Sequence, residues 1–332
     1  MKKKRLVSGM RPTGKLHWGN YFGALKNWVE LQEKFDCFFF IADWHALTTA
    51  YEDVSDIQSN VKEVLKDWLA VGIDPKKSTL FLQSFVTAHA ELHLILSMIT
   101  PLSWLQRVPS YKDMKLQMEG KDLDTYGFLG YPVLQTADVA LYGAACVPVG
   151  EDQLAHIELS REIIRRFHFV LKAENIFVEP EALLTKTPRV PGIDGRKMSK
   201  SFGNAIYIAD DETEMSKKVM ATITDPARQR RADPGDPDKC RLYDYHRLFT
   251  PDEERAEVDA DCRSAKIGCV DCKKKCIANA LKFWNPIREE RKKWDGKEAE
   301  LLQMLSAGSK QASESAEATL EKVKEKVGLH YT

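Results

Sequence analysis

Apolar runs and amphipathic segments alternate along the first half of the chain. Residues 37–42 form a continuous apolar run, which is typical of a parallel strand buried on both faces. Residues 5–8 and 79–82 are shorter strand candidates. Between these strands, residues 18–35 and 57–69 carry apolar side chains at helical spacing. Strands that alternate with helices predict an α/β fold with a doubly wound parallel sheet.

The alternation continues and then gives way to helices alone. Further predicted elements are helices at residues 88–99, 130–142 and 154–167 and strands at residues 146–149 and 205–208. Later helices are predicted at residues 212–222, 242–250, 252–265, 272–294, 298–305 and 311–326, the last on the surface. Pro286 should kink or split one of these helices, because proline cannot donate to the helical ladder. We therefore expect an α/β domain at residues 1–205 and a helical domain at residues 206–332.

Composition excludes a few classes of protein. The 332 residues are 43% hydrophobic and 30% charged, as in ordinary globular proteins. The chain has 49 basic residues (lysine plus arginine) and 49 acidic residues (aspartate plus glutamate), so its formal net charge is zero. Any nucleic-acid surface must therefore be a local basic patch. The basic first residues are not followed by the apolar segment of a signal peptide, and no apolar run is long enough to span a membrane. We expect a cytoplasmic location.

A polar segment at residues 196–204, with the sequence RKMSKSFGN, is the first candidate site. It follows a run rich in turn-forming residues, so it should be a mobile loop. Lys197 and Lys200 bring two ammonium groups close together, with Ser199 beside them. Ammonium groups, hydroxyls and glycine N–H groups together suit a polyphosphate. A solvated basic loop is the alternative for this segment taken alone.

A junction between the first strand and the first helix is the second candidate site. Gly9, Pro12 and Gly14 favour a tight turn, which leaves His17 and Asn20 at the helix N-terminus. The N-terminus of a helix attracts anions. A single histidine at this position is more often a capping or packing residue than a catalytic one.

Taken together, the two segments resemble the two signature sequences of class I aminoacyl-tRNA synthetases. Residues 197–201, KMSKS, match the second signature literally, whereas residues 17–20, HWGN, depart from the first at Trp18 and Asn20. The resemblance implies a Rossmann-like catalytic domain and catalytic roles for His17, Asn20, Lys197 and Lys200. It implies ATP with Mg²⁺ and ATP contacts from Arg11, Thr13, Gly19, Asn20, Lys115, Gly150, Asp152, Lys197, Met198, Ser199 and Lys200. Lys112 is the alternative to Lys115.

Further segments narrow the resemblance to tryptophanyl-tRNA synthetases of the bacterial type. They are residues 132–134 with residues 137–138, residues 147–153, and residues 224–228 through 233–237. The resemblance covers residues 5–291 and implies activation of L-tryptophan with ATP, followed by transfer to tRNA(Trp). It also implies a homodimer. Tyrosyl-tRNA synthetase is the nearest alternative, because only pocket residues separate the two enzymes.

Pocket chemistry favours tryptophan. Indole offers one N–H donor and no acceptor, so its pocket needs one fixed acceptor and apolar walls. Asp138, the single carboxylate of a largely apolar predicted helix, is the candidate acceptor, and the alternative is that it faces water or forms a salt bridge. Val7, Val147 and Val149 are candidate walls, His45 is a further pocket residue, and Tyr131 and Gln153 match family positions that contact the α-amino group.

The resemblance also assigns the helical domain to anticodon recognition. Its basic stripe, which could contact RNA phosphates, consists of Lys273, Lys274, Lys275, Arg288, Arg291, Lys292 and Lys293. Such charge runs are usually only solvated helix faces.

Five of the seven cysteines lie between residues 240 and 276. Cys240, Cys262, Cys269 and Cys272 have the spacing C-x21-C-x6-C-x2-C. Some bacterial tryptophanyl-tRNA synthetases hold a [4Fe–4S] cluster on a similar pattern, with a first spacing one residue longer. The resemblance therefore implies the metal ligands Cys240, Cys262, Cys269 and Cys272, with Cys276 as an extra candidate. Free thiols are the alternative.

Two other classes of protein remain open. A nucleotidyltransferase that does not act on tRNA can share the first signature, but it would not need the long helical region. An iron–sulfur RNA-binding or redox protein would hold a cluster without using ATP in response to an amino acid.

Overall fold

The computed structural model describes residues 3–108, 122–184 and 190–331. Its centre is a parallel sheet of five strands in the order β3-β2-β1-β4-β5. The strands are β1 (Arg5–Met10), β2 (Asp36–Ile41), β3 (Ser78–Leu82), β4 (Cys146–Val149) and β5 (Glu181–Leu184). Because β1 lies in the middle and the chain winds outward on both sides, the predicted doubly wound, Rossmann-like sheet is confirmed.

Two strand predictions differ from the structure. β5 was not predicted, because this edge strand has only four residues and its side chains are exposed or half-buried. The expected strand at residues 205–208 is wrong: Tyr207 makes only an isolated bridge to His17. That segment serves the site instead, since the Trp18 N–H donates to the Ile206 carbonyl.

Both faces of the sheet are covered, which explains the continuous apolar run of β2. Cys37, Phe39 and Ile41 belong to one buried cluster, while Phe38 and Phe40 belong to a second on the opposite face. The first face meets α2 (Lys26–Leu31) and α4 (Ile57–Ala70). The second meets α5 (Ala88–Ser97), α8 (Tyr126–Ala140) and α9 (Leu154–Val170). The same part of the chain also contains short helical segments: α1 (Trp18–Asn20), the π-helical turn Tyr21–Leu25, α3 (Asp43–Ala50) and α6 (Leu102–Gln106).

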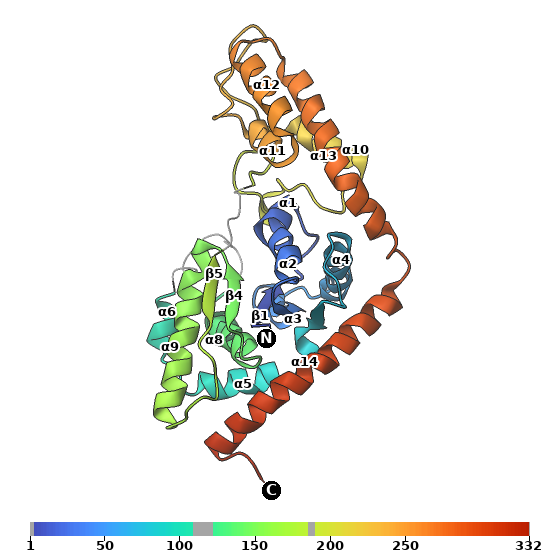
Figure 1. The fold of residues 1–332 in the computed structure, drawn as a ribbon. Coiled ribbons are helices and arrows are strands. Elements are labelled where there is room, and N and C mark those ends of the chain that lie inside the picture. Colours follow the sequence, from blue (N-terminus) through green and yellow to red (C-terminus); the bar gives the residue numbers. More distant parts are fainter. Residues whose placement is uncertain (1–2, 109–121, 185–189, 332) are drawn as a thin grey trace.

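The helical part forms a lobe beyond one end of the sheet (Figure 1). It contains α10 (Glu212–Ala221), α11 (Arg241–Phe249), α12 (Asp252–Arg263) and α13 (Cys269–Lys292). The helix α13 is continuous through Pro286, so of the expected kink or split, the split is wrong. Pro286 has no N–H to donate to the Lys282 carbonyl, four residues earlier. Both residues are exposed, so water can satisfy that carbonyl.

The last helix, α14 (Glu298–Val327), returns from this lobe to the sheet (Figure 1). It joins the two helices predicted at residues 298–305 and 311–326 into one, and it packs against β3. Ser309 Oγ accepts the Leu82 N–H at 3.2 Å, so the helix covers the edge strand and satisfies part of its backbone. Its second half is not a free surface helix, because Ala312, Ala316, Leu320 and Val323 are buried in the core. By its contacts α14 belongs with the sheet, although it lies in the expected second domain.

None of the described helices combines the length and the apolar composition needed to cross a membrane.

Candidate active site at the carboxyl end of the sheet

The two signature segments meet in space. The Lys200 ammonium donates to the Gly14 carbonyl at 2.9 Å, across 186 residues of sequence. Gly19 lies against the His17 ring and close to Met198: a Cβ built on Gly19 would lie 3.7 Å from Met198 Cβ. That Cβ would come within 2.9 Å of His17 Nδ1, so only glycine fits here. The predicted polyphosphate site therefore combines both segments.

His17 caps the helix that follows it. Its Nδ1 accepts the Asn20 N–H at 3.3 Å, and Asn20 Oδ1 accepts the His17 N–H at 3.0 Å, which is a reciprocal capping box. Burial and the charges of Lys200 and Lys197 lower the pKa of His17 to about 4. The imidazole is therefore neutral at pH 7, and because Nδ1 accepts a hydrogen bond, Nε2 carries the proton.

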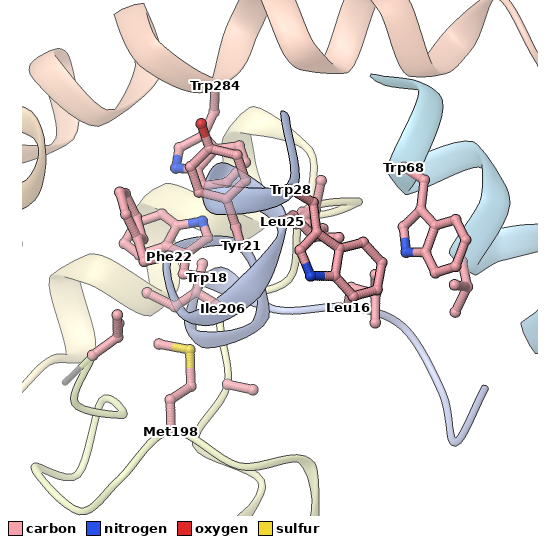
Figure 2. Close-up of a cluster of buried hydrophobic side chains, with 14 of the residues drawn as sticks. Leu16, Trp18, Tyr21, Phe22, Leu25, Trp28, Trp68, Met198, Ile206 and Trp284 are labelled. Atoms are coloured by element: carbon pink, nitrogen blue, oxygen red, sulfur yellow. The ribbon is translucent and has the colours of Figure 1, made fainter. Parts of the chain in front are cut away.

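An aromatic cluster fixes this junction to the helical lobe (Figure 2). The Trp18 ring stacks on Trp284 of α13, with centroids 5.8 Å apart, and lies edge-on to Phe249 at 4.7 Å. Met198 packs beneath Trp18 beside Ile206 and is only 4% exposed. The departure from the family signature at Trp18 thus has a packing reason. Because the Met198 side chain is buried, any contact of this residue with ATP must come from its backbone.

The lysine-containing segment is held in place by Asn204, a residue that we did not predict. Asn204 Oδ1 accepts the Ser199 N–H at 2.8 Å, and Nδ2 donates to Asp194 Oδ1 at 2.8 Å. Lys197 is exposed, whereas Lys200 is half-buried. Burial and the neighbouring charge of Arg11 lower the pKa of Lys200 to about 8.

Two adjoining cavities open where the strands end. The first, about 290 Å³, is lined by Val7, Val147, Val149, Asp138 and Gln153, among others. The second, about 250 Å³, shares Asp138 and Gln153 and adds Arg11, His45 and Tyr131. The structure thus brings all the predicted substrate residues together. A carboxylate among three valines suits a flat apolar ring with one donor.

Asp138 is both paired and placed at the cavities. Its Oδ2 lies 2.7 Å from His45 Nε2, and its Oδ1 lies 2.7 Å from both Gln83 Nε2 and His89 Nδ1. The donors from His45 and His89 hold the pKa of this buried carboxyl well below its usual range, against the effect of burial. Asp138 is therefore ionised at neutral pH. Asp138 is thus paired with neighbouring side chains and at the same time lines both cavities.

Several site residues escaped the sequence analysis. Gln83, at the end of β3, and His89 contact Asp138, while Gln135 and His156 line the cavities. Gln135 and Asp138 are three residues apart on α8, a spacing that places them on one helix face. Gln83 also follows a predicted strand at the edge where ligands bind. These two signals were available in the sequence.

The remaining predicted ATP residues are divided among three places. Thr13 is exposed on the turn after β1, next to the signature segments. Gly150 lines the first cavity, and Asp152 is exposed beside it in the 3₁₀ turn Glu151–Gln153. Lys112 and Lys115 lie outside the described residues.

The cysteines of the helical lobe gather in one place. The pKa of the Cys272 thiol is raised to about 12 by burial and by the nearby thiols of Cys240, Cys262 and Cys269. Arg228 Nη1 lies 3.8 Å from Cys262 Sγ, and His246 Nε2 lies 3.3 Å from Cys272 Sγ. Within the described ranges, no group of three or more His, Cys, Asp or Glu side chains is arranged to hold a single metal ion.

The predicted basic stripe is not continuous. Arg291 Nε donates to Asp67 of α4 at 2.7 Å, and Arg288 is buried and donates to the Asp210 carbonyl. Lys273 donates to the Met220 carbonyl at 2.7 Å. The expectation that Arg288 and Arg291 contact RNA phosphates is wrong, because both side chains hold the fold together. A regular spacing of cations cannot distinguish these inward residues from outward ones.

Comparisons with known proteins agree with this geometry. Residues 1–285 match the family model of the class I tRNA synthetases (W and Y). Tryptophan–tRNA ligase from Thermotoga maritima is 49% identical, and that from Aquifex aeolicus is 44% identical; each alignment covers 98% of this chain and 100% of the relative. The crystal structure of tryptophanyl-tRNA synthetase from Campylobacter jejuni complexed with ADP and tryptophan superimposes with a TM-score of 0.88, 34% identity and coverage of 98% and 100%.

Proposed function

The chain belongs to the class I tRNA synthetases for tryptophan and tyrosine, and from this premise we propose how its residues perform the reaction of a tryptophan–tRNA ligase. The tryptophan carboxylate attacks the α-phosphorus of ATP, which yields tryptophanyl-adenylate and pyrophosphate. A terminal ribose hydroxyl of tRNA(Trp) then attacks the acyl carbon, and AMP leaves. Both steps depend on positioning and charge stabilisation, and neither needs a nucleophile from the enzyme.

The observation that carries the proposal is the position of Asp138 among the valine walls, beside the two signature segments. The ionised carboxylate accepts the indole N–H, and Val7, Val147 and Val149 contact the ring. Tyr131 and Gln153 bind the α-amino group, and His45 orients the carboxylate. An amino acid without this donor would leave a buried carboxylate unpaired, which penalises its binding.

We assign the phosphates to the signature segments. Nε2–H of His17 donates to a phosphate oxygen, and Asn20 fixes His17 through the capping box. Lys197 and Lys200 stabilise the charge that develops on pyrophosphate. Backbone and side-chain contacts from Arg11, Thr13, Gly19, Gly150, Asp152 and Ser199 complete the ATP site, where Mg²⁺ would help to neutralise the charge of the phosphates.

The test is amino-acid-dependent exchange of pyrophosphate into ATP, with tryptophan and tyrosine measured in parallel. Exchange with tryptophan alone is expected, and Asp138→Asn should weaken it chiefly by raising the KM for tryptophan. Exchange with tyrosine alone would keep the reaction class and overturn the pocket assignment. No exchange with either amino acid would overturn the proposal.

For the cysteine group we propose a [4Fe–4S] cluster on Cys240, Cys262, Cys269 and Cys272. The mutual effect of these thiols on their pKa values supports it, because crowded thiolates are relieved by a bound cation. A cubane binds each thiolate through a different iron, so it does not require the tight arrangement of a single ion. When bound, the cluster cross-links α11, α12 and α13. Cys276 is fully buried in the core and is not assigned.

Iron and acid-labile sulfide in anaerobically purified protein test this assignment. Cys272→Ser should lose the iron, whereas Cys276→Ser, one helical turn away, should retain it. Zinc in place of iron, or no metal at all, would contradict the cluster.

We further propose that the helical lobe binds the tRNA anticodon and that the protein is a cytoplasmic homodimer. Three large apolar side chains support a dimer: Leu94 of α5, Met98 directly after α5 and Leu102 at the start of α6 are 55%, 75% and 60% exposed. Exposed apolar residues grouped in this way mark contact surfaces. Sedimentation should give a dimer for the wild type and a monomer for Met98→Lys.

A further inference from the structure

The acceptor of the tryptophan site is held by a second set of residues. Asp138 Oδ1 accepts two hydrogen bonds, from Gln83 and His89, each at 2.7 Å. Oδ2 receives one donor from a described side chain, His45 Nε2 at 2.7 Å. An ionised carboxylate offers about two acceptor positions on each oxygen. The open position therefore belongs to Oδ2.

Gln83 has its amide orientation fixed. Its Oε1 accepts the His45 backbone N–H at 3.4 Å, so its NH₂ group is the part that faces Asp138 Oδ1. The side chain is fully buried. A reversed amide would place oxygen against oxygen, which the buried site cannot tolerate.

His89 has its tautomer fixed in the same way. The ring is fully buried, and Nδ1 can donate to the ionised carboxylate only in the tautomer that carries the proton on Nδ1. In this tautomer Nε2 accepts a hydrogen bond from the Tyr142 hydroxyl, which lies 2.7 Å away. Burial and the charge of Asp138 raise the pKa of Tyr142 well above its usual range, so the hydroxyl stays a donor. Without that donor, the ring could adopt the tautomer that turns a lone pair toward Asp138.

We propose that Tyr142 and His89 are positioning residues for tryptophan recognition: Tyr142 sets the tautomer of His89, and His89 holds Oδ1 so that Oδ2 presents its open position to the indole N–H. Neither residue lines either of the two cavities described above. They act through Asp138, and the inference rests on the proposed role of Asp138 as the indole acceptor.

The consequence is a defect in discrimination. A tryptophan analogue with sulfur in place of the indole N–H, benzothienylalanine, has nearly the same shape but no donor. The wild type should reject it, because it leaves Oδ2 with an unused acceptor position in a buried site. A variant that misplaces Oδ2 should lose affinity for tryptophan. Its affinity for the analogue should change little, because the analogue makes no hydrogen bond to Oδ2.

The experiment measures kcat/KM for both amino acids by pyrophosphate exchange and compares their ratio. Tyr142→Phe keeps the ring and should lower the preference for tryptophan by about three- to tenfold, mainly through KM. His89→Leu removes the donor to Oδ1 and should lower the preference at least as far. His89→Asn puts an amide N–H near the position of Nδ1 and has no second tautomer, so it should restore most of the preference. In the His89→Asn background, Tyr142→Phe should have no further effect on the ratio.

Thermal unfolding of each variant separates positioning from folding. A merely structural role would lower the melting temperature and reduce kcat/KM for both amino acids equally, which would overturn the inference. If the wild type and the Tyr142→Phe variant prefer tryptophan over the analogue to the same extent, this inference alone would be overturned. A wild type that uses tryptophan and the analogue equally would overturn the role of Asp138 and this inference with it. Absence of exchange with tryptophan would overturn the proposed function itself.

Discussion

At the scale of single residues, one imidazole serves both the fold and the chemistry. Nδ1 of His17 completes the helix cap, and this contact leaves the Nε2 proton for a ligand. The pKa of about 4 keeps the ring neutral, so its role is to donate a hydrogen bond and not to carry charge. In the proposed mechanism, the same side chain therefore serves both as a helix cap and as a hydrogen-bond donor to a phosphate.

Replacing His17 by asparagine should separate these uses. Asparagine is a strong helix cap, so the free energy of unfolding should change by less than about 0.5 kcal/mol. Asparagine has no group at the position of Nε2, so adenylate formation should slow by about 100-fold. His17→Ala, the matched variant, should slow the reaction similarly and also lose about 1 kcal/mol of stability. Rapid-quench kinetics and urea unfolding measure the two effects, and wild-type kinetics in His17→Asn would contradict the assignment.

The Lys200 ammonium gives a pH dependence with a defined sign. Its pKa of about 8 in the free protein means that the positive charge is present below pH 8 and is lost as the pH rises through that value. The affinity for the MgATP anion should therefore fall above pH 8. Lys200→Arg should remain charged and flatten the profile, which titrations of ATP binding between pH 6 and 9.5 would reveal. A flat wild-type profile would contradict this prediction.

Removing Lys200 tests its catalytic role. Lys200→Ala should slow adenylate formation by about 100-fold or more, because the charge acts on pyrophosphate as it forms. The affinity for tryptophan should be nearly unchanged, since Lys200 does not line either cavity. Equal losses in both quantities, measured by single-turnover kinetics and equilibrium binding, would refute the role.

At the scale of elements, α14 depends on a glycine. A Cβ on Gly308 would lie 1.9 Å from the Leu80 carbonyl oxygen, so the helix approaches β3 more closely than any side chain allows. This contact brings Ser309 to the edge strand. The position of α14 against the sheet therefore requires glycine at one point of an otherwise ordinary amphipathic helix.

Gly308→Ala should lower the free energy of unfolding by about 1–3 kcal/mol, because the helix must shift away from β3. Gly127→Ala is the matched control in α8, where a Cβ meets nothing within 4 Å. That change should be neutral or should stabilise by up to about 1 kcal/mol. Urea unfolding checks both variants, and equal effects would show that the close approach is unimportant.

At the scale of the whole molecule, the helical lobe is joined to the sheet through the aromatic cluster at Trp18 and through a buried ion pair. Arg291 of α13 pairs with Asp67 of α4, which is fully buried, and with Glu63. Burial raises the pKa of Asp67 to about 6 even beside the guanidinium. The pair fixes how α13 lies against α4, and thereby where the lobe stands relative to the active site.

Arg291→Met should lower the free energy of unfolding by about 3–5 kcal/mol, because it leaves the Asp67 carboxylate buried without a partner. The double variant Asp67→Asn with Arg291→Met should recover part of that loss, since no unpaired charge remains. Urea unfolding measures both. A double variant no more stable than the single one would show that charge burial is not the cause.

The sequence by itself determined the alternation of strands and helices, the doubly wound parallel class of the sheet, and the reaction class. It could do so because β2 is apolar on both faces and because the two signatures are local strings of residues. Local strings of residues also singled out His17, Asp138 and the cysteines as candidate site residues. Periodicity set the bounds of most helices within a few residues.

Only the tertiary structure decided which polar groups meet. Gln83 and His89 lie 55 and 49 residues from Asp138 along the chain, and only the fold brings both side chains to its Oδ1. The inward turn of Arg291 and the return of α14 to β3 depend on partners more than 200 residues away. Such contacts escape a local pattern because it records how a residue relates to its neighbours in the chain. Burial and pairing, in contrast, are set by elements that only the fold brings together.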